Sequence, residues 1–279
     1  MSDNSLTQIF KEKIEQHLDM ADAISTGPDT ELQKKILYLV IIDGISSATY
    51  PDMENENRKR FTKTVEKFSE WTHCSLYSLP KVHKFFNIMD IPHSKSIKDE
   101  LEKGMDLLID RHIGIPQGYV HALERSANPM MEQVISLAND VPADFIDNFI
   151  EENKDSISNR YKKLLRSFKH KELLYEYRNS LVHTLFPLGM NQRPEEPLEP
   201  HYEPYTIIDP RNPASEYHFF DLVYPVNFLS NIARNILNNV AIHFESNGDG
   251  SLAQFGRSEI FWKSELNVDL ELGEVLLRS

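Results

Sequence analysis

The hydrophobic positions of this chain recur mainly at three- and four-residue spacing, the period of an amphipathic α-helix. Between residues 4 and 22 the residues Leu6, Ile9, Phe10, Ile14 and Leu18 form one apolar stripe. Residues 31–47 are apolar on nearly every side, which is typical of a helix at the centre of a bundle. The same periodicity predicts further helices over 57–72, 155–170, 173–186 and 226–244.

Prolines divide residues 75–155 into short pieces. There we expect helices over 81–89, 95–110, 117–126, 129–139 and 143–152. After a proline-rich loop, Tyr205–Ile208 and Tyr217–Val223 have the pattern of two short strands around the Asp209–Pro210 turn. The predicted fold is therefore an all-α bundle forming a single domain over 1–279, with a helical insertion at 75–155 and a loop plus β-hairpin at 187–224.

The amino-acid composition excludes several classes of protein and of binding site. With 40% hydrophobic residues the chain can build a proper core. It has no apolar run of about 18 residues, so we expect no membrane-spanning helix and no membrane partner. Cys74 is the only cysteine, which excludes an intramolecular disulfide and a Cys-based zinc site. The polar N-terminus is unlike a secretory signal, and we expect a cytoplasmic location.

The net charge of −13 has the wrong sign for a general nucleic-acid binder, so any RNA contact must use a local basic patch. One such patch runs from Arg160 to His183, where cations outnumber carboxylates. Its members include Lys163, Arg166, Lys169 and Lys171, and Arg60 lies in a second basic stretch at 57–72. An ordinary solvated helix face is the alternative interpretation of such a run.

The most informative stretch is LLYEYRNSLVHTLF, residues 173–186, because it sets Arg178, Asn179 and His183 into a predicted helix. Asn179 and His183 are four residues apart and so share a face. The Arg178 side chain is long enough to bend toward them. Imidazole transfers protons near neutral pH and guanidinium grips phosphate, so these groups suit phosphate chemistry. A similar spacing at Arg211 and His218 contains Pro213 and cannot lie on one helix.

Asp43 is an acidic residue within the apolar segment 31–47. A buried carboxylate needs a partner. It can pair with a nearby arginine or cap a backbone amide for structural reasons alone. Equally, an Arg and a His on a buried helix can serve only to bond carbonyls or a carboxylate such as Asp43. Under the functional interpretation, Asp43 supports the site by holding Arg178 or by facing the cleft.

The segment RNSLVH resembles the motif of the HEPN family of helical RNA-cleaving domains, in which an Arg is followed after four to six residues by a His. Asn179 matches the polar residue that often follows the Arg. The segment KKILYLVIIDGISSATYP also resembles the long apolar second helix of such proteins. The resemblance covers about residues 30–75 and 155–245 and implies a HEPN-like helical bundle.

This resemblance implies a metal-independent endoribonuclease that needs no cofactor. Two copies would form a homodimer, and the RNA 2′-hydroxyl would attack the adjacent phosphate to leave a 2′,3′-cyclic phosphate. His183 would act as general acid or base, Arg178 would neutralise charge on the phosphate, and Asn179 would orient one of them. DNA would resist cleavage. The family also implies a toxin, stress or anti-phage defence role and an inhibitory or antitoxin protein as partner.

Two other functions remain open from the sequence. A non-catalytic helical dimer that binds RNA or a protein partner would keep the basic patch without needing His183. A metal-dependent nuclease using Asp52 and Glu54 would differ by its sensitivity to a chelator, although the spacing around these residues is poor. For the ribonuclease, the substrate-binding candidates are Lys163, Arg166, Lys169, Lys171 and Arg60.

Overall fold

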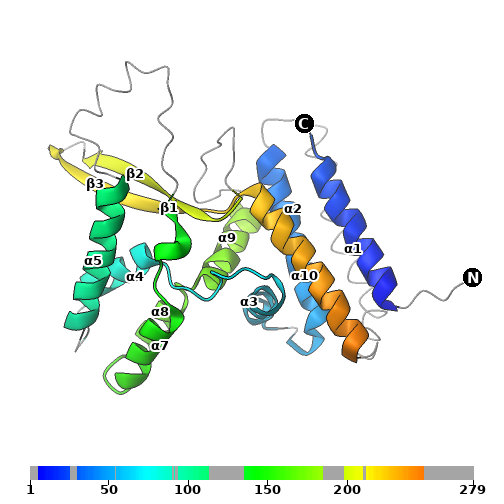
Figure 1. Cartoon of the computed structure of the whole chain (residues 1–279), viewed down its shortest axis with the longest axis horizontal. Helices are drawn as coiled ribbons and strands as arrows, with labels where there is room; N and C mark the ends of the chain where they lie inside the picture. Colours follow the sequence, from blue (N-terminus) through cyan, green and yellow to red (C-terminus); the bar gives the residue numbers. More distant parts are fainter. Residues whose placement is uncertain are drawn as a thin grey trace, which may run out of the picture. The chain divides into compact units, whose positions relative to one another are not determined.

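The computed structural model describes residues 6–25, 30–53, 55–89, 91, 94–112, 135–184, 198–209 and 212–247 (Figure 1). It is mostly helical with a small three-stranded antiparallel sheet, which confirms the predicted all-α class with a β-hairpin. The chain forms two compact units. Unit 1 comprises residues 1–70 and 230–279, and unit 2 comprises residues 71–229, so one boundary falls inside the last described helix.

Unit 1 is built from helices whose apolar stripes meet in one core. Its elements are α1 (Leu6–Ala23), α2 (Thr30–Thr49), the short 3-10 turn η1 (Pro51–Met53), α3 (Asn57–Phe68) and most of α10 (Val226–Asn247). Phe10 of α1 and Phe244 of α10 meet edge to face, with 5.8 Å between ring centroids. On α2, Leu39, Ile42 and Ile45 are fully buried, as its apolar sequence predicts.

The end of α3 shows how polar side chains complete this unit. The sequence predicts the helix to 72, but it ends at Phe68 because Ser69 is its C-cap and Glu70 has a left-handed φ of 60°. The carbonyls at this end need partners. Asn239 Nδ2 of α10 donates to the Phe68 carbonyl at 2.9 Å, and Asn235 Nδ2 donates to the Ser69 carbonyl at 3.2 Å. These bonds tie α3 to α10.

Unit 2 combines helices with the sheet. Its elements are α4 (Leu79–Ile88), α5 (Lys95–His112), β1 (Ile135–Ser136), the 3-10 turn η2 (Leu137–Asn139), α7 (Ala143–Glu152), α8 (Asn159–Arg166), α9 (His170–Thr184), β2 (His201–Asp209) and β3 (Asn212–Val223). The strands lie in the order β1–β2–β3 and all pair antiparallel. The predicted hairpin is present, longer than its sequence pattern indicated.

The helix expected over 129–139 is wrong for the residues described there. Ile135 and Ser136 instead form β1, with Cα partners Tyr202 and His201 on β2. The Ser136 hydroxyl then accepts a hydrogen bond from the Ala138 amide and starts the 3-10 turn η2. Strand pairing thus overrides a local helical pattern. The helix expected at 117–126 lies outside the described residues.

The helices predicted over 155–170 and 173–186 are present as α8 and α9, but α8 is shorter than predicted and α9 begins earlier, at His170. Ser158 caps the start of α8 by accepting from the Tyr161 amide. After residues 167–169, the first amides of α9 do not continue the α8 ladder. The amides of His170 and Lys171 donate instead to the carbonyls of Leu76 and Cys74, at 3.0 and 2.9 Å. A tertiary contact therefore sets where α9 begins.

In the part of the chain that the structure describes, no helix is long and apolar enough to cross a membrane.

Core burial in unit 1 gives a direct test of the fold. Ile42 is fully buried on α2, whereas Ile242 on α10 is 59% exposed. Ile42→Ala should lower the free energy of unfolding by about 2–5 kcal/mol, because it removes buried methyl groups and leaves a cavity. Ile242→Ala, the matched control, should change it by less than about 0.5 kcal/mol. Urea denaturation measures both, and equal effects would contradict this core.

Candidate functional site

The three residues that the sequence singles out lie on the second half of α9. This helix buries Leu174, Tyr177 and Leu181 along one stripe. At about 100° per residue, Asn179 and His183 lie on the opposite side of the helix from that stripe, and Arg178 lies near its edge. The exposures agree, because His183 is exposed while Arg178 and Asn179 are half-buried. The helical spacing therefore places the imidazole toward solvent.

The Arg178 side chain turns toward Asn179. Its Nη1 donates a hydrogen bond to Asn179 Oδ1 at 3.1 Å. The guanidinium thus leans from the edge of the buried stripe toward the side that carries Asn179 and His183. This bond leaves the amide NH2 of Asn179 as a donor for other groups. The arrangement supplies a permanent cation, an oriented amide and a titratable ring within two helical turns.

The five basic residues predicted to bind substrate differ in their exposure and in their partners. Lys163 and Arg166 are exposed on α8, and Lys171 is half-buried on α9. Lys169 Nζ is held 2.8 Å from Asp147 Oδ2 and lies over the Tyr77 ring at 5.0 Å. Arg60 belongs to unit 1, and its 7% exposure leaves little of it available to a substrate. Of these cations, Lys163 and Arg166 are thus the most accessible to a substrate, whereas Lys169 is ion-paired and Arg60 is buried.

Asp43 is half-buried on α2, within unit 1. Its backbone carbonyl accepts a hydrogen bond from the Ser47 hydroxyl one turn later, at 3.2 Å. Arg178 belongs to unit 2. The expected support of Arg178 by Asp43 therefore stays a prediction.

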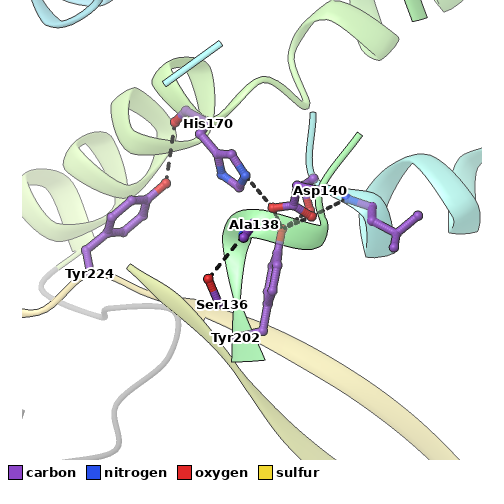
Figure 2. A network of polar contacts seen from close by, with 8 residues as sticks. Ser136, Ala138, Asp140, His170, Tyr202 and Tyr224 are labelled. Carbon is purple, nitrogen blue, oxygen red and sulfur yellow. Dashed lines mark hydrogen bonds and ion pairs between the residues drawn. The ribbon is translucent and has the colours of Figure 1, made fainter. Parts of the chain in front are cut away.

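A buried polar network that the sequence did not predict centres on Asp140 (Figure 2). His170 Nε2 lies 2.6 Å from Asp140 Oδ2, and the Leu79 amide donates to Oδ1 at 2.8 Å. The Tyr202 hydroxyl lies 3.1 and 2.9 Å from the two carboxylate oxygens and 2.8 Å from Ser78 Oγ. The network joins the start of α4, the end of η2, the start of α9 and strand β2.

Protonation in this network follows from its contacts. Among the described residues, His170 Nδ1 is buried and meets no hydrogen-bond partner. The tautomer with hydrogen on Nε2 is therefore favoured, because it donates to the carboxylate without burying an unpaired N–H. Burial, followed by the charge of Asp140, raises the pKa of Tyr202 well above its ordinary value. Tyr202 therefore stays a hydroxyl that can donate to Asp140.

The network is closed to solvent, since the side chains of His170 and Asp140 are 0% and 2% exposed. It therefore acts on structure rather than on a substrate. Its members come from four separate segments, so no local spacing in the sequence points to them. Figure 2 also shows the Tyr224 hydroxyl directed at the His170 carbonyl, 3.5 Å away. Hydrogen bonds thus hold both the side chain and the backbone carbonyl of His170, the first residue of α9.

Metal chemistry finds no support in the described ranges, where no group of three or more His, Cys, Asp or Glu residues is placed to hold a metal ion. Asp52, one of the two candidates for a metal-dependent nuclease, lies in η1. Glu54, the other, lies outside the described residues.

Comparison of the chain with protein-family models, with curated proteins and with solved structures finds no significant match.

Loss of the central carboxylate should destabilise the protein strongly. Asp140→Asn replaces an acceptor-only group by an amide that brings two donors among the donors of His170, Tyr202 and Leu79. We expect the free energy of unfolding to fall by about 3 kcal/mol, as for other broken buried networks. Asp155→Asn, at an exposed position, is the control. A denaturant midpoint for Asp140→Asn equal to that of the control would refute this role.

The Asp147 contact predicts a dependence on pH. Burial alone would raise the pKa of Asp147, but hydrogen bonds from Lys169 and Tyr77 outweigh it and hold the pKa below its ordinary value. A lowered folded-state pKa stabilises the protein above the unfolded value, and this stabilisation is lost as pH falls through the folded value.

Asp147→Asn should therefore be less stable than the wild type at pH 7, and the difference should shrink below about pH 4. Urea midpoints between pH 7 and pH 3 measure this, with the exposed Asp99→Asn as reference. A difference that stays constant over the whole range would contradict the assignment.

Proposed function

We propose that the protein is a metal-independent endoribonuclease of the HEPN type. The observation that carries the proposal is the placement of Arg178, Asn179 and His183 on α9, with Arg178 Nη1 bonded to Asn179 Oδ1 and His183 exposed. The resemblance of RNSLVH to the HEPN motif gives these three residues their roles. In the proposed enzyme, two copies of the chain form the active dimer. It acts in stress response or anti-phage defence, and an inhibitory protein partner controls it.

The reaction uses the 2′-hydroxyl of RNA as its nucleophile. As the 2′-oxygen bonds to phosphorus and the P–O5′ bond breaks, the 2′-hydroxyl loses a proton and the leaving 5′-oxygen gains one. His183 performs one of these two transfers, as base or as acid, and water performs the other. Arg178 stabilises the extra negative charge on the phosphoryl oxygens. Asn179 orients the guanidinium through their hydrogen bond. The products are a 2′,3′-cyclic phosphate and a free 5′-hydroxyl.

His183→Ala provides the central test. Removing the general acid or base should slow cleavage of single-stranded or transfer RNA in EDTA by about 100-fold or more. His73→Ala, a half-buried histidine in the same unit, should retain activity. Arg178→Lys should recover only part of the rate lost in Arg178→Ala, because lysine keeps the charge but not the fork of donors. The measurement is gel-resolved cleavage with identification of the cyclic phosphate end.

Three results would contradict the proposal. Equal cleavage by the wild type and His183→Ala places the activity elsewhere. Inhibition by EDTA points to a metal-dependent nuclease. RNA binding without cleavage by the wild type favours the non-catalytic binding module. A substrate with a single 2′-deoxy position at the cleaved site serves as an internal control, because it should resist cleavage there.

A further inference from the structure

Helix α8 presents a strip of cations that the proposed chemistry does not use. Its sequence, NRYKKLLR, has four cations in eight residues and no carboxylate. Leu165 is fully buried on one side of the helix. Arg160, Lys163 and Arg166 follow each other at three-residue spacing on the other side, and all three side chains are exposed. At about 1.5 Å rise per residue, the strip is about 9 Å long.

The contacts of neighbouring cations separate the strip from the rest of the basic patch. Lys169 is paired with Asp147, and Lys162 Nζ donates to the Lys154 carbonyl. For Arg160, Lys163 and Arg166, by contrast, we find no side-chain hydrogen bond or ion pair among the described residues. Arg166 acts on Asp147 only at longer range, where its charge helps lower the pKa of that carboxyl. These three cations therefore remain able to bind an anion.

The aromatic rings beside the strip face inward. Tyr161 of α8 and Phe168 just after it both meet Phe85 edge to face, at 5.8 and 5.9 Å between ring centroids. Proteins that bind single-stranded nucleic acid through its bases usually offer aromatic rings for stacking. On α8 the exposed side chains are three cations together with Asn159 and Leu164, and no aromatic ring is among them. The chemistry of the strip thus suits backbone phosphates, which carry no sequence information.

We propose that Arg160, Lys163 and Arg166 form a phosphate-docking strip that holds the RNA strand during its cleavage at α9. This inference rests on the proposed ribonuclease function. Residues 167–169 connect α8 to the start of α9, while His183 lies on the last turn of that helix. Figure 1 draws α8 beyond the start of α9 rather than along it. The strip and the imidazole are therefore at opposite ends of α9.

This separation sets a length requirement on the RNA. The 13 steps along the helix from His170 to His183 rise by about 20 Å. A stacked strand advances by about 3.4 Å per nucleotide, so about six nucleotides are needed to reach from one end of α9 to the other. A trinucleotide can occupy the catalytic end only. A strand of 20 nucleotides can contact both places.

The kinetic test compares two triple variants of the full-length protein. The first is Arg160→Gln/Lys163→Gln/Arg166→Gln. The matched control is Lys95→Gln/Lys98→Gln/Lys103→Gln, which removes the same charge from α5 in the same unit. For an unstructured 20-nucleotide RNA, the first variant should raise KM by about tenfold or more with kcat unchanged, since phosphate contacts bind ground and transition states alike. The KM for a trinucleotide should not change in either variant.

A binding test works without catalysis. In a His183→Ala background, the affinity for the 20-nucleotide RNA is measured by fluorescence anisotropy over a range of salt concentrations. Each lost phosphate contact should reduce the slope of log K against log salt by about 0.7, so the strip variant should lose about 2 units of slope. A 20-nucleotide single-stranded DNA should show the same loss, because it carries the same phosphates.

The outcomes separate the two proposals. Cleavage of the long RNA with equal KM in the strip and control variants overturns the docking strip and leaves the ribonuclease standing. A slope loss confined to the strip variant, in a protein that never cleaves RNA, supports the strip as a nucleic-acid contact and overturns the ribonuclease. A raised KM for the trinucleotide in the strip variant also overturns the strip, because that substrate cannot reach it.

Discussion

The fold of unit 2 depends on one buried carboxylate. Asp140 is 6% exposed and accepts hydrogen bonds from a backbone amide at the start of α4 and from Tyr202 on β2, while it meets His170 at the start of α9. A buried carboxylate is stable only when its oxygens are satisfied. Segments distant in sequence must therefore converge on it. The same requirement places the first residue of α9 against the sheet.

This constraint divides α9 into two functional halves. Its first turn is fixed by His170, by the backbone bonds to residues 74 and 76, and by the Tyr224 hydroxyl. Its last turns carry the Arg178–Asn179 bond and the exposed His183. A rigid helix transmits the position of its anchored end along its length. The side chains proposed for chemistry can thus stay solvent-facing and still be held in a defined orientation.

The sequence correctly predicted those helices whose position is determined by the local spacing of hydrophobic residues. The apolar stripes located α1, α2 and α10, and the pattern at 143–152 matched α7 to the residue. It failed where a tertiary contact decides the conformation. The two-residue strand β1 depends on its pairing with β2, and the start of α9 at His170 depends on the carbonyls of Cys74 and Leu76. Neither has a local signal.

The candidate site also has a part that local sequence spacing could predict and a part that it could not. Arg178, Asn179 and His183 could be grouped from spacing alone, because one helix carries them. The Asp140 network could not, since its members are contributed by residues 78, 140, 170 and 202. The burial of Arg60 and the ion pair between Lys169 and Asp147 likewise depend on tertiary structure. A basic run in the sequence therefore does not tell which of its cations are available.

The charge of the whole chain and the charge of α8 act over different distances. A net charge of −13 disfavours long-range attraction of RNA. At physiological salt, however, charges farther apart than about 8 Å are largely screened. A phosphate close to Arg160, Lys163 and Arg166 therefore interacts mainly with its neighbours on α8. There Lys169 already pairs with Asp147, a carboxylate whose pKa the charge of Arg166 also helps to lower. A locally basic contact is thus compatible with an acidic protein, and its affinity should depend on salt.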